Sequence, residues 1–151
     1  MNSTCEKLKQ RWSNKHESGR VDFIQGNSIK LLEDRYDILI PGTFKSYLQT
    51  TAPMPHQDSV DDDFVDWWSA DRIKNIPEEY DGEISHEQIA KHSGKYLFFA
   101  DYCIWSWAWA ICCQSGSDYG KIAVIGGKDR FVADNFDKFV ELSLTDIDAL
   151  N

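Results

Sequence analysis

The strongest pattern in this chain is the stretch KYLFFADYCIWSWAWAICC, residues 95–113. Trp105, Trp107 and Trp109 stand at every second position, which is the spacing of side chains on one face of a β-strand. The letters YLFFADY before them predict a preceding strand that ends in a turn. We therefore predict a central aromatic hairpin whose tryptophans are buried in the core, and we do not expect them to form an exposed platform for ligands.

Asp101 stands at the end of the first predicted strand, beside Tyr102 and close to Trp105. An Asp among aromatic residues can belong to a binding or catalytic site. An Asp at the end of a strand can also accept backbone N–H groups and shape the turn that follows. We expect this structural role for Asp101, so that its loss would lower stability more than it lowers affinity for a partner.

The chain has 151 residues, of which 42% are hydrophobic and 13% aromatic, and this is enough for one globular core. No apolar run approaches the roughly 20 residues of a membrane span, and the first residues lack the hydrophobic segment of a signal peptide. We therefore expect a cytoplasmic protein. The cysteines form no C-x-x-C pair, so we interpret them as buried thiols, not as a zinc site or a disulfide framework. They are Cys5, Cys103, Cys112 and Cys113.

Charge is distributed unevenly along the chain. Residues 1–57 carry a net charge of +2 and residues 58–151 a net charge of −11, which together give the formal −9. An acidic surface repels nucleic acids and anionic membranes, and it attracts basic proteins. A protein partner with a basic surface is one interpretation of this charge, and plain solubility is the other.

Several further segments have the apolar spacing of amphipathic helices. The first follows a capping box at Ser3 and Glu6, and the last covers residues 134–144. Residues 121–125 and 131–132 predict two more strands. The predicted core residues of the hairpin and the last helix are Phe99, Trp105, Trp107, Trp109, Phe136 and Phe139.

The order of these segments resembles the SMI1/KNR4 family, also called the SUKH superfamily. The resemblance is carried by IKLLEDRYDILIPGTFKSYL, DDDFVDWWSADRIKNIPEEY, YLFFADYCIWSWAWAI, YGKIAVIGG and RFVADNFDKFVEL, within residues 28–150. One departure is Thr51-Ala52-Pro53-Met54, where the family often has a turn of the Asn-Gly-Gly type. The resemblance divides the chain into an SMI1/KNR4-like domain, 28–151, and an N-terminal extension, 1–27, packed on it.

The resemblance implies an α+β fold, with a twisted, mostly antiparallel sheet and helices packed on one side. It also implies a protein that works by binding other proteins, without enzymatic activity or a cofactor. Many bacterial members are immunity proteins that neutralise polymorphic or contact-dependent toxins, and fungal members regulate cell-wall synthesis. An immunity protein is therefore the function that we expect.

An acidic stretch, HQDSVDDDFVDWW, is the candidate partner-binding segment. Its carboxylates could face a basic partner, remain solvated in a loop, or hold a hard cation, although the EF-hand pattern is absent. Two adjacent tryptophans could anchor a partner at the rim of the acidic patch. The candidate residues are Asp58, Asp61, Asp62, Asp63, Asp66, Trp67 and Trp68.

No other pattern predicts chemistry. The four histidines have no metal-ligand spacing, and no serine or cysteine stands in a nucleophile motif, so we expect no catalytic and no metal-binding residues. Two alternatives to an immunity protein remain open. One is a housekeeping scaffold or regulatory protein of the same family without a toxin partner. The other is a small metal-dependent hydrolase that uses the cluster from Asp58 to Asp66.

If the acidic stretch faces a toxin, replacing Asp61, Asp62 and Asp63 by Asn should weaken protection. The experiment co-expresses each variant with the toxin domain of the adjacent gene and measures growth. The triple variant should rescue growth less well than the wild type, because attraction to a basic surface is lost. Full rescue by the triple variant would remove the acidic stretch from the mechanism.

Overall fold

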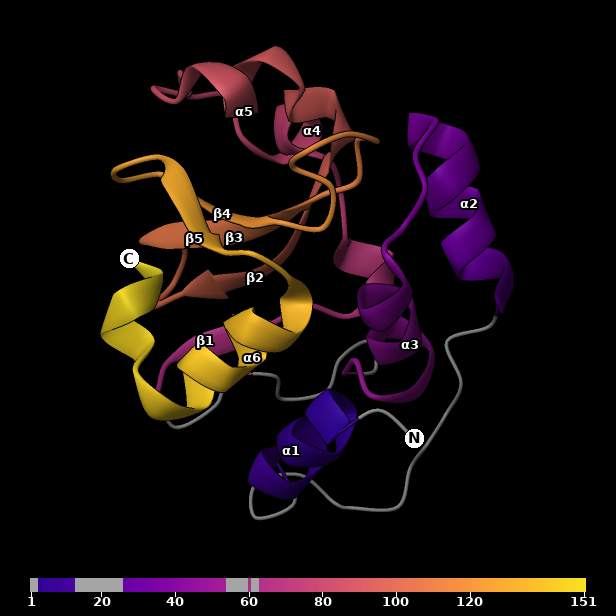
Figure 1. Cartoon of the computed structure of the whole chain (residues 1–151), viewed down its shortest axis with the longest axis vertical. Helices are drawn as coiled ribbons and strands as arrows, with labels where there is room; N and C mark the ends of the chain where they lie inside the picture. Colours follow the sequence, from indigo (N-terminus) through magenta and orange to yellow (C-terminus); the bar gives the residue numbers. More distant parts are fainter. Residues whose placement is uncertain (1–2, 13–25, 54–59, 61–62) are drawn as a thin grey trace.

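The computed structural model describes residues 3–12, 26–53, 60 and 63–151 (Figure 1). Helices occupy both ends of the described chain, and the strands lie mainly in its second half. In chain order the elements are α1 Ser3–Trp12, α2 Gly26–Tyr36, α3 Gly42–Thr50, β1 Val65–Trp67, the 3-10 helix η1 Ala70–Arg72, α4 Ile76–Glu79, α5 Glu87–Lys91, η2 Ser93–Lys95, β2 Tyr96–Tyr102, β3 Trp107–Cys112, β4 Ile122–Ile125, β5 Arg130–Ala133, α6 Phe136–Thr145 and η3 Ile147–Leu150.

The strands form one five-stranded antiparallel sheet in the order β1-β2-β3-β4-β5. Each strand pairs with the strand that follows it in the chain, so the sheet is a simple meander. The central pair, β2 and β3, runs from Tyr96 opposite Cys112 to Tyr102 opposite Trp107. The register shifts between Phe98 and Ala100, so Phe99 is an extra residue that increases the local twist. The predicted α+β fold with an antiparallel sheet is confirmed.

Helices α1, α3 and α6 form a layer on one face of the sheet (Figure 1). Aromatic rings fill the space between the two layers. Phe99 of β2 contacts Phe136 and Phe139 of α6 at centroid distances of 5.6 and 5.0 Å, and Trp109 of β3 lies 5.3 Å from Phe139. All four of these side chains are 0% exposed, as predicted for the core.

Helix α1 contributes to the same core. Cys5, Leu8 and Trp12 point inward and are 1%, 0% and 9% exposed. The Trp12 ring meets the Trp67 ring edge to face at 5.6 Å. The first described helix is therefore part of the packed structure, and it has the apolar face expected of an amphipathic helix.

The segment from η1 to α5 covers the opposite face of the sheet (Figure 1). Tyr80 follows α4 and stacks on Trp105 at 5.6 Å, and His86 meets Phe131 of β5 edge to face at 5.2 Å. The sheet thus lies between a main helical layer and a second layer of short helices.

The prediction that Trp105 continues the row of Trp107 and Trp109 is wrong. Trp105 lies in the turn between β2 and β3 with a φ of 60°, and its ring packs against Phe98 at 5.4 Å on the second layer's side. Trp107 begins β3 and stacks on Tyr102 at 4.6 Å. Both Trp105 and Trp107 are half-buried, so neither is a fully buried core residue. The spacing of two residues does not show that Trp105 and Trp107 belong to different elements. The chain turns between these two residues, so Trp105 lies in the turn and Trp107 in the strand.

Three of the cysteines are buried as predicted, and the fourth is not. Cys5, Cys112 and Cys113 are at most 2% exposed, whereas Cys103 is exposed in the turn after β2. Burial raises the pKa of the Cys112 thiol and, more strongly, that of Cys113. A thiol with a raised pKa forms less thiolate, which is the reactive species.

We therefore predict that one of the four thiols reacts rapidly with Ellman's reagent at pH 8 in the native protein. The other three thiols should react only after denaturant is added, because unfolding exposes them to the reagent and removes the burial that raises the pKa values of Cys112 and Cys113. The Cys103→Ser variant should lose the rapid phase alone. A rapid phase that persists in this variant would place another thiol at the surface.

Candidate functional site

The turn between β2 and β3 lies beside the residue that precedes β1. The Cys103 N–H donates to the Phe64 carbonyl oxygen at 3.0 Å, so the two backbones are adjacent. We call Phe64, Cys103 and Ile104 the hairpin tip. Ile104 is 98% exposed and Phe64 is 60% exposed, so two large apolar side chains project into solvent at the end of the sheet.

The backbone of the hairpin tip is in the left-handed region. The φ angles are 66° at Phe64, 48° at Cys103 and 56° at Ile104, and 60° at the following Trp105. None of these residues is glycine, and Ile is β-branched, so each such conformation costs about 1 kcal/mol or more. Strained residues of this kind persist only where the surrounding structure holds them.

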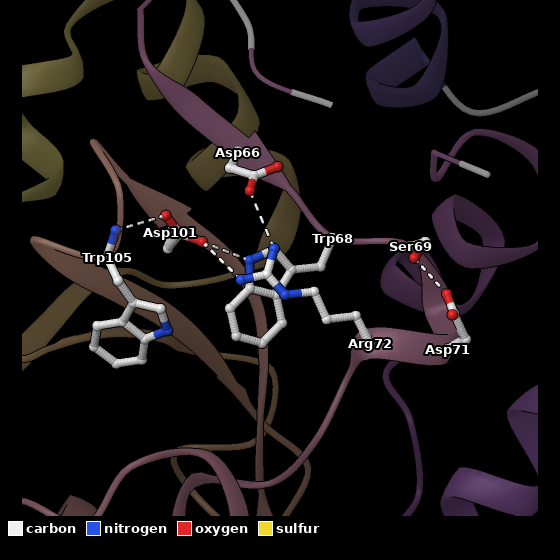
Figure 2. Close-up of polar contacts among 7 residues, drawn as sticks. All are labelled: Asp66, Trp68, Ser69, Asp71, Arg72, Asp101 and Trp105. Atoms are coloured by element: carbon white, nitrogen blue, oxygen red, sulfur yellow. Dashed lines mark hydrogen bonds and ion pairs between the residues drawn. The ribbon is translucent and has the colours of Figure 1, made fainter. Parts of the chain in front are cut away.

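Asp101 is the residue that holds the turn (Figure 2). Its side chain is buried, with the residue 2% exposed. Oδ1 accepts the backbone N–H of Trp105 at 3.0 Å, and Oδ2 accepts the indole N–H of Trp68 at 2.8 Å. The first bond fixes the turn, and the second ties the turn to the segment after β1. The structural role predicted for Asp101 is the one observed.

Arg72 of η1 balances the buried carboxylate. One guanidinium nitrogen lies 3.4 Å from Asp101 Oδ2 and the other 3.1 Å from Asp66 Oδ2. The guanidinium also lies 4.1 Å from the centroid of the Trp68 ring, in a cation–π contact (Figure 2). Figure 2 further shows the Ser69 hydroxyl donating to Asp71 at the start of η1. Arg72 of η1 thus links Asp66 of β1 to Asp101 of β2, which accepts a hydrogen bond from the turn.

Close packing restrains the base of the turn as well. The Trp105 ring lies between Tyr80, stacked at 5.6 Å, and Phe98, at 5.4 Å. Gly126 has a φ of 108°, and a Cβ atom there would lie 3.3 Å from the Trp105 ring. The chain after β4 therefore approaches Trp105 closely because residue 126 is glycine. Through the Trp105 ring, the turn packs against Tyr80, Phe98 and the backbone at Gly126.

The structure describes four of the seven sequence-predicted partner-binding residues. Asp58, Asp61 and Asp62 lie outside the described residues. Among the others, Asp63 pairs with Arg11 of α1, and Asp66 pairs with Arg72. These carboxylates connect parts of the fold, and Asp63 directly precedes the exposed Phe64 in the chain.

Trp67 and Trp68 are 0% and 1% exposed, so the prediction that they anchor a partner at the surface is wrong. Trp67 faces the main core between Trp12 and Phe139, at 5.6 and 5.8 Å. Trp68 packs on Phe98 at 6.0 Å on the other side of the sheet and donates to Asp101. Adjacent positions of an extended chain point to opposite sides, and here both sides are covered.

Sequence reasoning missed Phe64 and Ile104 as surface residues. Both are apolar residues next to predicted strands or aromatic runs, so their residue type favours burial: Phe64 precedes Val65 and two tryptophans, and Ile104 precedes the tryptophan row. The available signal was the length of the apolar stretch, because residues 96–112 must contain a turn if they form two strands. Which residues occupy that turn is not visible from periodicity alone.

Among the described residues, no group of three or more His, Cys, Asp and Glu side chains is placed to hold a metal ion. Within that same part of the chain, no helix is long and apolar enough to cross a membrane. The chain matches no known family model and none of the curated proteins with which it was compared. The resemblance to the SMI1/KNR4 family therefore stays a prediction from the sequence.

We predict that Asp101→Ala lowers the free energy of unfolding by about 2–4 kcal/mol, because it leaves the Trp68 indole N–H and the Trp105 backbone N–H without their buried acceptor. Urea denaturation followed by tryptophan fluorescence measures the change. The matched control is Asp34→Ala, which removes an exposed carboxylate on α2 and should change stability by less than about 0.5 kcal/mol. Equal effects of the two substitutions would contradict the role assigned to Asp101.

Proposed function

We propose that this protein is a non-enzymatic protein-binding module that acts by occupying the surface of a partner protein. The observation that carries the proposal is the hairpin tip, where Ile104 and Phe64 are 98% and 60% exposed on a buried hydrogen-bonded support. Exposed apolar residues on a rigid frame favour association, because little conformational entropy is lost when the partner binds.

Charge supports the same proposal and describes the partner. The chain carries a formal charge of −9, and residues 58–151, which include the hairpin tip, account for a net −11. Such a surface steers a basic protein into contact and accelerates its association at low ionic strength. The proposed partner is therefore a protein domain with a positively charged surface.

We further propose that the partner is a toxin domain and that the protein acts in the cytoplasm as its immunity protein. The support for this finer statement is the ordered resemblance to the SMI1/KNR4 family, in which many bacterial members have that role. Toxic nucleases bind a polyanion and carry basic clefts, and an acidic protein can cover such a cleft. Inhibition would follow from steric exclusion of the substrate.

The test is direct binding between the full chain and the toxin domain of the adjacent gene. Isothermal titration calorimetry should show a 1:1 complex whose Kd rises about tenfold between 50 and 300 mM NaCl, because salt screens the attraction between opposite charges. Bovine serum albumin, which is also acidic, serves as a control that should not bind the toxin. An absence of binding to the toxin domain at low salt would contradict the proposed partner.

A further inference from the structure

We propose that Ile104 is the anchor residue of this protein, and that it inserts into an apolar pocket bordered by Lys or Arg on a basic partner protein. The inference rests on the proposed function and names the part of the hairpin tip that carries affinity. Its basis is an unfavourable residue choice in the free protein, combined with the position of that residue.

Ile104 contributes little to the fold of its own chain. At 98% exposure its side chain buries almost no surface in the free protein, so it gains no hydrophobic stabilisation there. Its φ of 56° lies in a region that β-branched residues rarely adopt and that Asn, Asp and Gly adopt readily. At position 104, Asn, Asp or Gly would therefore give a more stable monomer than Ile does.

The surroundings of Ile104 are built to present it. The backbone N–H of Trp105 donates to buried Asp101, and the Ser106 N–H and hydroxyl donate to the Tyr102 and Cys103 carbonyl groups at 2.8 and 2.9 Å. These hydrogen bonds fix the residues before and after residue 104, and they leave the Ile104 side chain exposed to solvent. A rigid apolar side chain that projects from a surface fits a concave site on a partner, as interface anchors do.

Two kinds of partner could bind the hairpin tip, a second copy of this chain or a different, basic protein, and charge favours the basic protein. A second copy of this chain also carries a formal charge of −9, so long-range repulsion disfavours the association of two copies. A basic protein is attracted instead. Phe64, with its backbone beside that of Cys103, extends the apolar contact and would meet the rim of the same pocket.

The test compares Ile104→Asn with Leu39→Asn. Leu39 is also an exposed aliphatic residue, at 58%, and does not have a left-handed φ. Its carbonyl accepts the hydroxyl of Tyr119 at 2.9 Å, and Tyr119 follows the far end of β3. Leu39 and the hairpin tip therefore lie at opposite ends of the central strands, roughly 20 Å apart.

Two measurements are made on the full chain with each substitution. Thermal unfolding gives the Tm, and calorimetry with the toxin domain of the adjacent gene gives the Kd. Ile104→Asn should raise the Tm by about 2–4 °C, because it relieves backbone strain, and should raise the Kd at least tenfold, because it removes the anchor. Leu39→Asn should not raise the Tm and should change the Kd less than twofold.

The outcomes separate this inference from the proposed function. If the wild-type chain does not bind the toxin domain, the proposed function fails and the anchor falls with it. If the wild type binds and Ile104→Asn binds equally well, the anchor assignment is overturned while the proposed function stands. If Ile104→Asn lowers the Tm, Ile104 stabilises the monomer, which overturns the inference drawn from strain.

Discussion

The buried carboxylate of Asp101 is the interaction on which this end of the protein depends. Trp68 and Trp105 donate to its two oxygens, and Arg72 supplies the opposite charge. A buried carboxylate is tolerated only with such partners, because an unpaired charge in an apolar surrounding is very unfavourable. These partners compensate for the burial of the Asp101 charge. In turn, the contacts of Asp101 fix the positions of β1, η1 and the turn relative to one another.

The aromatic core gives this network a stable base. On one face of the sheet, rings from β1, β2 and β3 pack against α1, α3 and α6, and on the other face Trp105 packs between Tyr80 and Phe98. Burial of these aromatic rings and of the aliphatic residues around them stabilises the fold. The strained left-handed residues of the hairpin tip can persist because the free energy gained by that burial exceeds the cost of their conformation.

The two halves of the structure therefore have different purposes in the proposed function. The core and the Asp101 network determine where the hairpin tip stands and keep it rigid. Ile104 and Phe64 bury little surface in the monomer, and Ile104 has a left-handed φ that is unfavourable for a β-branched residue. Residues held in rarely adopted backbone conformations cluster at binding and switch sites, and the exposed, left-handed Ile104 is such a residue.

Residue patterns alone predicted the antiparallel hairpin, the apolar faces of the helices and the turn-shaping role of Asp101, and the resemblance to the SMI1/KNR4 family predicted the class of the fold. The first three predictions follow from local periodicity and from the hydrogen-bonding habits of single residues. Packing in three dimensions determines that Trp67 and Trp68 are buried, that Trp105 lies in a turn outside the strand and that Ile104 and Phe64 are exposed to solvent. Exposure depends on which elements cover each face, and the position of a turn depends on strand register, so neither is encoded in the spacing of residues along one segment.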